Sequence, residues 1–269
     1  MAQQEFGIGR KNDQKPGLEN RGERSLKGKV ALVTGSSRDI GAEIAAALAE
    51  NGVCIIGNYL KETKKAERVR MGIEQRDGIA EFVQADITIA GERQRFIKLL
   101  DKSFGGKLDF VVLNTSGNSE TARAVCVEAN NALVDEFLPR INEGGKIVLM
   151  QSVPGHFAPE LRELGKMPSF YDLIAGAKYE GETLLRLRIP EFQKNGVSLI
   201  VVCPPEVEDT LNMQVFKRRD KSISEKHAEI SDILGIRRAV TIREVGEKVV
   251  ELLKRKDLQQ GYIEFFRKL

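Results

Sequence analysis

Three side chains that can take part in proton transfer stand close together in the middle of the chain. Ser152 lies in LMQSVPG, directly after an apolar run, and Tyr171 and Lys178 lie in SFYDLIAGAKYEG, residues 169–181. A phenol can donate a proton to a carbonyl oxygen, and a serine hydroxyl can orient that oxygen. This chemistry requires that one helix present the tyrosine and the lysine together.

The spacing of Tyr171 and Lys178 meets this requirement. Seven helical steps of about 100° end about 20° short of two full turns, so both side chains project from one face, about 10.5 Å apart along the axis. Ser169 followed by Asp172 resembles a capping box, which predicts that the helix begins near Phe170. Tyr171 would then lie in the first turn, where the helix dipole and protonated Lys178 favour the phenolate.

A second interpretation of this helix stays open. Tyr171 would instead belong to the apolar face of a core helix. Tyr179 lies about 100° around the helix from Lys178, which predicts a structural role for it.

A glycine-containing turn stands at the start of the predicted domain. The apolar run KVALVT, residues 29–34, continues into TGSSRDIG, residues 34–41, and a helical pattern follows. In such a turn the glycines let the backbone approach a pyrophosphate, and the helix N-terminus supplies amides and a positive dipole end. The alternative is a strand-to-helix turn that binds nothing.

The rest of the chain alternates apolar runs with amphipathic segments. Residues 41–52, 64–75 and 242–256 have apolar side chains at helical spacing. Apolar strands joined by helices predict a parallel sheet covered on both faces. We therefore expect one Rossmann-type doubly wound α/β domain, with its ligand site at the carboxyl ends of the strands near the switch point of strand order. The seven predicted strands are residues 29–34, 53–58, 79–84, 108–113, 146–151, 197–203 and 261–266.

In these motifs the chain resembles the short-chain dehydrogenase/reductase family, over about residues 28–267. Gly35 and Gly41 match the T-G-x3-G-x-G turn of the family, while Asp39 replaces the middle glycine and places a carboxylate near the phosphates. The resemblance implies that Ser152, Tyr171 and Lys178 are catalytic and that Lys178 also holds the cofactor ribose. The cofactor-binding residues that it implies are Gly35, Ser37, Arg38, Ile40, Gly41, Asn58, Tyr59, Asp86, Ile87, Asn114, Lys178 and Thr210.

The end of the second strand indicates which cofactor is bound. An acidic side chain there would accept a hydrogen bond from a ribose 2'-hydroxyl, whereas a 2'-phosphate needs cations and no acid. The strand ends in GNYLK, residues 57–61, and Arg38 lies in the first turn. We therefore predict NADP(H). The alternative for Lys61, Lys64 and Lys65 is a solvated start of the next helix.

Three features depart from the usual pattern of the family. A Tyr-x3-Lys motif would place its tyrosine at Ile174; the Tyr-x6-Lys spacing is similar to that of the enoyl-acyl-carrier-protein reductases. The connection after Asn114 is short, and the usual asparagine is absent, with Cys126 or Asn130 nearby. In CPPEVEDT, residues 203–210, a proline replaces the glycine that precedes the carboxamide-binding threonine.

The stretch between Ser152 and Tyr171 is longer than is usual in the family, and we expect it to cover the substrate cleft. It contains His156. Two roles stay open for this histidine: a hydrogen-bond donor to a substrate oxygen, or a solvated loop residue.

Composition indicates which partners and which cellular location to expect for this domain. The 269 residues carry a net charge of +3 from evenly mixed charges, so we expect a small-molecule substrate and neither a nucleic-acid nor a membrane partner. The absence of a leader and of a long apolar run, with three scattered cysteines expected to be buried thiols, predicts a cytoplasmic location. Polar residues 1–27 are predicted to be a flexible tail, or alternatively a docking arm, before a catalytic domain at 28–269. The resemblance implies a homodimer or homotetramer.

Together these features predict an oxidoreductase that transfers hydride between NADP(H) and a carbonyl, or an activated enoyl, with Tyr171 as proton donor. The alternative is a non-catalytic nucleotide-binding protein that keeps the fold and has lost the chemistry, as Ile174 at the usual tyrosine position would suggest.

Overall fold

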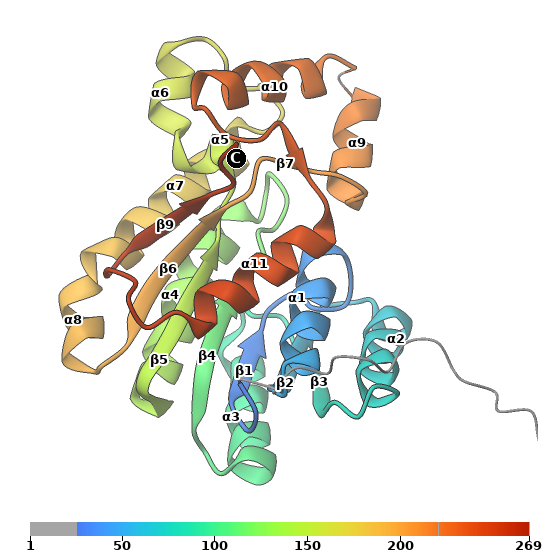
Figure 1. Cartoon of the computed structure of the whole chain (residues 1–269), viewed down its shortest axis with the longest axis vertical. Helices are drawn as coiled ribbons and strands as arrows, with labels where there is room; N and C mark the ends of the chain where they lie inside the picture. The colour runs from blue at the N-terminus through green and yellow to red at the C-terminus, as the bar shows by residue number, and fades with distance from the viewer. Residues whose placement is uncertain (1–25, 220, 269) are drawn as a thin grey trace, which may run out of the picture.

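A seven-stranded parallel sheet forms the centre of the computed structural model, which describes residues 26–219 and 221–268 (Figure 1). The strands follow the order β3-β2-β1-β4-β5-β6-β9. Each of the seven predicted strands is confirmed, and the predicted doubly wound fold class is confirmed with them. The strands are β1 (Val30–Val33), β2 (Cys54–Tyr59), β3 (Ala80–Gln84), β4 (Leu108–Leu113), β5 (Ile141–Met150), β6 (Ser198–Cys203) and β9 (Tyr262–Phe265).

Helices cover both faces of this sheet, because strands buried on two sides need an apolar layer on each. One layer contains α1 (Asp39–Glu50), α2 (Thr63–Glu74) and α11 (Ile242–Lys254). The opposite layer contains α3 (Ala90–Phe104), the π-helical η1 (Ala124–Ala129), α4 (Asn130–Phe137), the short η2 (Leu138–Arg140), α7 (Asp172–Leu187) and α8 (Ile189–Lys194).

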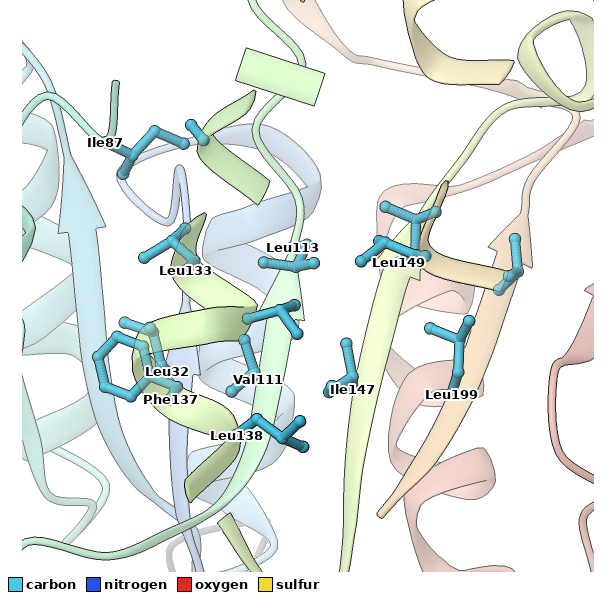
Figure 2. Packing of buried hydrophobic residues seen from close by; sticks show 14 of the residues in the cluster. Leu32, Ile87, Val111, Leu113, Leu133, Phe137, Leu138, Ile147, Leu149 and Leu199 are labelled. Carbon is cyan, nitrogen blue, oxygen red and sulfur yellow. The ribbon is translucent and has the colours of Figure 1, made fainter. Parts of the chain in front are cut away.

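Side chains from strands and helices meet in the second layer (Figure 2). Leu133 and Phe137 of α4 lie against Leu32 and Val111 of the neighbouring strands β1 and β4, and all four belong to one buried cluster. Because helix α4 follows β4 closely in sequence, this packing fixes the course of the short connection that leaves β4 at Asn114.

A smaller group of elements lies beyond the carboxyl ends of the strands. It contains α5 (Val153–His156), α6 (Ala158–Glu163), α9 (Leu211–Arg219) and α10 (Ile223–Ile233), with a two-stranded pair of β7 (Glu206–Val207) and β8 (Ala239–Val240). Figure 1 shows α6, α9 and α10 grouped together above the ends of the sheet. The chain crosses from β3 back to β4 beside β1, so the switch point of strand order lies beneath this group.

The packed domain includes Leu26, which falls inside the segment predicted to be a tail. Leu26 is buried in the cluster of the α1 and α11 layer, and its backbone N–H donates to the carbonyl oxygen of Asn51. The domain therefore extends to Leu26 rather than beginning at residue 28. Residues 1–25, which make up most of the predicted tail, lie outside the described residues.

The cysteines only partly follow the prediction. Cys126 and Cys203 are buried free thiols, whereas Cys54 at the start of β2 is half-buried. Burial raises the pKa of Cys203 well above its ordinary value, which keeps this thiol protonated. Within residues 26–219 and 221–268, no helix has the length and apolar character needed to cross a membrane.

Candidate active site

A large cavity, of about 910 Å³, opens at the carboxyl ends of the strands. Its lining includes residues that follow β1, β2, β4, β5 and β6, which is where a parallel sheet places its ligands. Every predicted site residue lines it: Gly35, Ser37, Arg38, Ile40, Gly41, Asn58, Tyr59, Asp86, Ile87, Asn114, Ser152, Tyr171, Lys178 and Thr210.

The hydroxyl groups of Ser152 and Tyr171 are in hydrogen-bond contact in this cavity. Ser152 Oγ and Tyr171 Oη are 3.0 Å apart, and either can be the donor. Ser152 is also the N-cap of α5, because its Oγ accepts a hydrogen bond from the backbone N–H of Gly155 at 3.1 Å. The cap fixes the serine rotamer, so the two hydroxyls face one point in the cavity.

Lys178 is held on the same side by the end of β5. Its Nζ donates to the carbonyl oxygen of Met150 at 3.0 Å. Gly155 lets helix α5 approach this position, since a Cβ on Gly155 would lie 3.0 Å from Lys178 Cβ and 2.3 Å from Gln151 Oε1. Helices α5 and α7 therefore pack closely, which brings the serine and the lysine to one wall of the cavity.

Helix α7 begins later than predicted. Its first residue is Asp172, so Tyr171 is the N-cap rather than a residue of the first turn, and the cap has no side-chain hydrogen bond. The predicted capping box of Ser169 and Asp172 is therefore wrong. The carboxylate of Asp172 instead accepts from Arg162 Nε at 2.6 Å, a contact between α7 and α6 that the local pattern does not reveal.

The remaining residues of this helix separate into core and surface. Ile174, the usual tyrosine position, is buried and packs with Cys126 and Ala177, and the ring of Tyr171 lies against this cluster. Tyr179 is 39% exposed and is not part of the cavity lining. Tyr171 and Lys178 thus share the cavity wall, as their spacing predicted, and Tyr179 does not.

The turn after β1 has no room for a side chain at Gly35. Gly35 has φ +64°, and a Cβ there would lie 2.7 Å from Thr115 Oγ1. That hydroxyl is buried, lines the cavity and has no hydrogen-bond partner among the described residues. Asp39 has φ +49°, a left-handed conformation that explains why related turns place glycine there. A glycine cradle beside an unpaired hydroxyl fits a polar group of a dinucleotide.

Asn58 connects the turn to the neighbouring strand. Its Oδ1 accepts from the backbone N–H of Gly35 at 3.3 Å, and its Nδ2 donates to the carbonyl oxygen of Ala85 at 3.0 Å. Asn58 is buried and these bonds occupy its amide. The side chain therefore supports the turn, while Tyr59 and Lys61 extend along the cavity lining at the end of β2.

Other predicted cofactor residues also have local partners. The Asp86 carboxylate accepts from the backbone N–H and the hydroxyl of Thr88 at the start of α3. The Thr210 hydroxyl donates to the carbonyl oxygen of Val207 and accepts from the N–H of Met213, which caps α9. Both positions thus hold the loops of the cavity in place.

Comparisons with known proteins identify the family of this chain. The family model for short chain dehydrogenases matches residues 29–220. This chain belongs to the short-chain dehydrogenase family. Hydroxynaphthalene reductase arp2 of Aspergillus fumigatus is 30% identical to it over 90% of this chain and 91% of that protein.

Solved structures of the family share the fold. The angucycline C-6 ketoreductase LanV with bound NADP is 22% identical, with a TM-score of 0.70 over 89% of this chain and 94% of that chain. A short chain dehydrogenase from Burkholderia cenocepacia in complex with NADP is also 22% identical, with a TM-score of 0.70 over 89% and 97% of the two chains.

The connection that follows Asn114 differs from the usual short-chain dehydrogenase pattern. It contains the π-helical η1, in which Cys126 is buried and its Sγ donates to the carbonyl oxygen of Ser116. Asn130 donates from Nδ2 to the Cys126 carbonyl oxygen, and its Oδ1 is buried without a partner among the described residues. Neither residue is part of the cavity lining, so the usual asparagine has no direct replacement there.

His156 takes neither of the two roles left open for it. It lies in α5, is absent from the cavity lining, and packs edge-on against Phe157 and Phe265. Its Nδ1 lies 2.8 Å from a carboxylate oxygen of buried Glu182 in α7. Gln151 Nε2 donates to the same carboxylate and to the carbonyl oxygen of Lys178. This network joins α5, α7 and the end of β5 beneath the site.

The cavity lining also contains a polar group that the sequence pattern does not indicate. Glu206 of β7, which is buried, and His227 of α10 both belong to the lining, and Lys217 of α9 pairs with Glu206 at 2.7 Å. The chain has two histidines, and His227 lies in a segment with ordinary amphipathic spacing. The low number of histidines in the chain was the one signal that could have drawn attention to His227, and it did not indicate a position beside the cavity.

Proposed function

We propose that this protein is an NADP(H)-dependent reductase that transfers hydride to the carbonyl group of a ketone. The observation that carries the proposal is the 3.0 Å contact between Ser152 Oγ and Tyr171 Oη in the cavity that the glycine turn also lines. Two adjacent hydroxyls can hydrogen-bond to one carbonyl oxygen, and that oxygen is where negative charge develops during hydride addition.

The choice of NADP(H) has two independent supports. Arg38, in the turn after β1, and Lys61, which follows β2, both line the cavity, and the acid Glu62 next to Lys61 is paired with Lys65 at 3.2 Å. The solved relatives LanV and the Burkholderia cenocepacia enzyme contain bound NADP. When bound, the cofactor would supply the hydride from its nicotinamide ring.

The side chains of the protein would supply the proton and the orientation. Tyr171 donates its phenolic proton to the carbonyl oxygen, and Ser152 donates a second hydrogen bond to that oxygen. Lys178 has three N–H donors, one of which is used by the Met150 carbonyl oxygen, so the others can hold cofactor ribose hydroxyls. The ammonium charge of Lys178 in the same cavity would also favour transfer of the phenolic proton.

The alternative, a nucleotide-binding protein without catalysis, rests on Ile174 at the usual tyrosine position. It predicts NADPH binding and no turnover with any ketone. The position of Tyr171 beside Ser152 favours the reductase, because it places a phenol in the site without a tyrosine at Ile174.

Substitution of Tyr171 tests the mechanism. Tyr171→Phe removes the proton donor, and we expect kcat for ketone reduction to fall by about 10²- to 10⁴-fold while NADPH affinity is retained. Steady-state NADPH oxidation and a fluorescence titration of NADPH measure the two quantities. Tyr179→Phe is the matched control, because it also removes one phenolic hydroxyl, but from outside the cavity.

A gain-of-function variant separates the two hypotheses. Ile174→Tyr would restore the usual spacing, so a protein that had lost catalysis would gain activity. If Tyr171 is the acid, the added ring instead crowds the buried cluster around Cys126 and activity does not rise. Parental turnover by Tyr171→Phe would show that the proposed proton donor is wrong.

A further inference from the structure

A polar cluster contributes to the cavity lining through Glu206 and His227. It is formed by Glu206 of β7, Lys217 of α9, and Ser224 and His227 of α10. Glu206 accepts from Ser224 Oγ at 3.3 Å and pairs with Lys217 Nζ at 2.7 Å. Three elements that are separate in sequence therefore place a carboxylate and an imidazole on one surface of the cavity.

His227 is the member of this cluster whose hydrogen bonding is incomplete. Its side chain is 14% exposed, and its Nδ1 is buried without a hydrogen-bond partner among the described residues. The nearest carboxylate oxygen, Glu206 Oε2, lies 3.8 Å away, which is just beyond hydrogen-bond range. Buried polar groups are normally paired, so an unpaired buried nitrogen in a residue that lines the cavity points to a ligand-dependent arrangement.

Burial of His227 favours its neutral form. Burial lowers the pKa of this imidazole, Glu206 acts in the opposite direction, and Lys217 adds to the lowering. In the neutral ring one nitrogen carries a proton and the other accepts. A small inward movement would let Nδ1–H donate to Glu206, and Nε2, on the other side of the ring, would then be a hydrogen-bond acceptor.

An acceptor of this kind selects a neutral donor. Glu206 is buried and already paired with Lys217, whose side chain is 47% exposed, so a cationic substrate group would have to compete with that ion pair. A hydroxyl group supplies one donor without a charge, and it matches an imidazole acceptor.

Part of the cavity lining is aromatic and apolar. The ring centroids of Phe170 and Phe216 are 5.0 Å apart, and that of Tyr171 lies 5.6 Å from Phe216. Met213 and Ile230 add apolar side chains to the same lining. Aromatic side chains at these separations favour contact with another ring.

We propose that His227, oriented by Glu206, recognises a hydroxyl group on the substrate, remote from the carbonyl that is reduced. The inference rests on the proposed ketone reductase function and deepens it, because it names the substrate class: hydroxylated aromatic ketones. The observations that support it are an unpaired imidazole nitrogen, a carboxylate that is already paired with a lysine, and an aromatic lining.

The test compares matched ketones with and without the hydroxyl. The probes are α-tetralone and the isomers of it that carry one hydroxyl on the aromatic ring, each assayed with NADPH. For the parent we expect kcat/KM at least about tenfold higher for one hydroxylated isomer than for α-tetralone, because a site built to hydrogen-bond a hydroxyl discriminates against its absence. In His227→Leu the ratio should fall to within about twofold, mainly through KM.

Two further variants distinguish recognition from altered packing. His227→Gln replaces the imidazole by an amide whose oxygen can accept a hydrogen bond from a hydroxyl, so this variant should retain part of the preference. Met213→Leu changes the apolar lining alone and should affect both ketones alike. A parent without preference, or a His227→Leu variant that weakens both ketones equally, would overturn the proposal.

A binding measurement separates this proposal from the reductase function. Calorimetry of the same ketones with the protein saturated with NADP+ reports recognition without turnover. If no ketone is reduced but hydroxylated isomers bind more tightly to the parent than to His227→Leu, the reductase function fails and the recognition site stands. If ketones are reduced and neither assay shows a preference that depends on His227, the recognition site fails alone.

Discussion

Asp39 shows how one residue adapts the phosphate turn. It has φ +49°, where glycine would be unstrained, and its carboxylate accepts from the backbone N–H of Leu211 at the start of α9. Asp is among the residues that tolerate this conformation best. The side chain thus links the turn to the group of helices above the cavity, at the cost of a negative charge in the cavity lining.

The predicted preference for NADPH over NADH depends on Arg38, which is next to Asp39. Arg38→Ala should weaken NADPH by about 1.5 to 3 kcal/mol, or about ten- to a hundredfold, and weaken NADH far less, because a charge-assisted contact to the 2'-phosphate is lost. Titration of both cofactors into the parent and the variant measures the difference. Equal affinity of the parent for NADPH and NADH would contradict the assignment. Lys64→Ala is a matched control, since Lys64 is exposed and outside the cavity lining.

At the scale of elements, close backbone packing holds α7, the helix that carries the proposed catalytic lysine. A Cβ on Gly181 of α7 would lie 2.2 Å from the Cys126 carbonyl oxygen of η1, so only glycine allows this approach. On another side of α7, Gly155 permits contact with α5. The helix is therefore fixed between two elements, and this fixes where its first residues, next to Tyr171, enter the cavity.

Helix α11 has the clearest sequence signal for its start. Thr241 Oγ1 accepts from the backbone N–H of Glu244, and the Glu244 carboxylate accepts from the N–H of Thr241, which is a complete capping box. Thr241→Ala should lower the free energy of unfolding by about 1 kcal/mol. Urea denaturation at neutral pH measures this change, and an unchanged midpoint would argue against the cap.

The same cap predicts a pH dependence. The backbone hydrogen bond from Thr241, with help from Arg237, lowers the pKa of Glu244 to about 2. A carboxyl group whose pKa is lower in the folded than in the unfolded state stabilises the fold at pH values above its unfolded-state pKa. This contribution is lost as the pH falls toward the pKa of the folded state. We expect Glu244→Gln to be less stable than the parent at pH 7, with the difference shrinking below pH 4.5. Glu247→Gln, which removes an exposed ion pair with Arg243, should show little of either effect.

At the scale of the whole molecule, α7 presents an apolar surface away from the cavity. Leu173 and Leu187 are 67% and 72% exposed, and Leu184 lies on the same face. Large apolar side chains gathered on one helix face indicate an interface. We predict a homodimer or homotetramer that uses α4 and α7, as the family resemblance implies. Light scattering at micromolar concentration should give a mass of at least twice 29.9 kDa, which Leu187→Glu should reduce. A monomer mass for the parent would refute it.

The prediction that the N-terminal tail is dispensable can be tested by truncating the chain before and after Leu26, the first described residue. Deletion of residues 1–25 should leave the melting temperature and NADPH affinity unchanged, because their composition offers no core. Deletion of residues 1–27 also removes Leu26 from the buried cluster and should lower the melting temperature. Differential scanning fluorimetry of the two truncations provides the comparison; a large loss from the shorter deletion would mean that the tail has a structural role.

The amino-acid sequence by itself determined the sheet and the positions of the site residues along it. Apolar runs of strand length and the turn at residues 34–41 depend on local interactions, so all seven central strands were predictable. The helical period likewise predicted that Tyr171 and Lys178 share a face, because it follows from backbone geometry alone. These features need no knowledge of distant neighbours.

The tertiary structure decided which partners the polar side chains contact. Asp172 contacts Arg162 and does not form the expected capping box. His156 contacts buried Glu182 and does not line the cavity. His227 entered the cavity because α10 packs beside β7, which places it 3.8 Å from Glu206, a residue 21 positions earlier. Polar side chains have several partners within reach, and only the packing of distant elements selects among them.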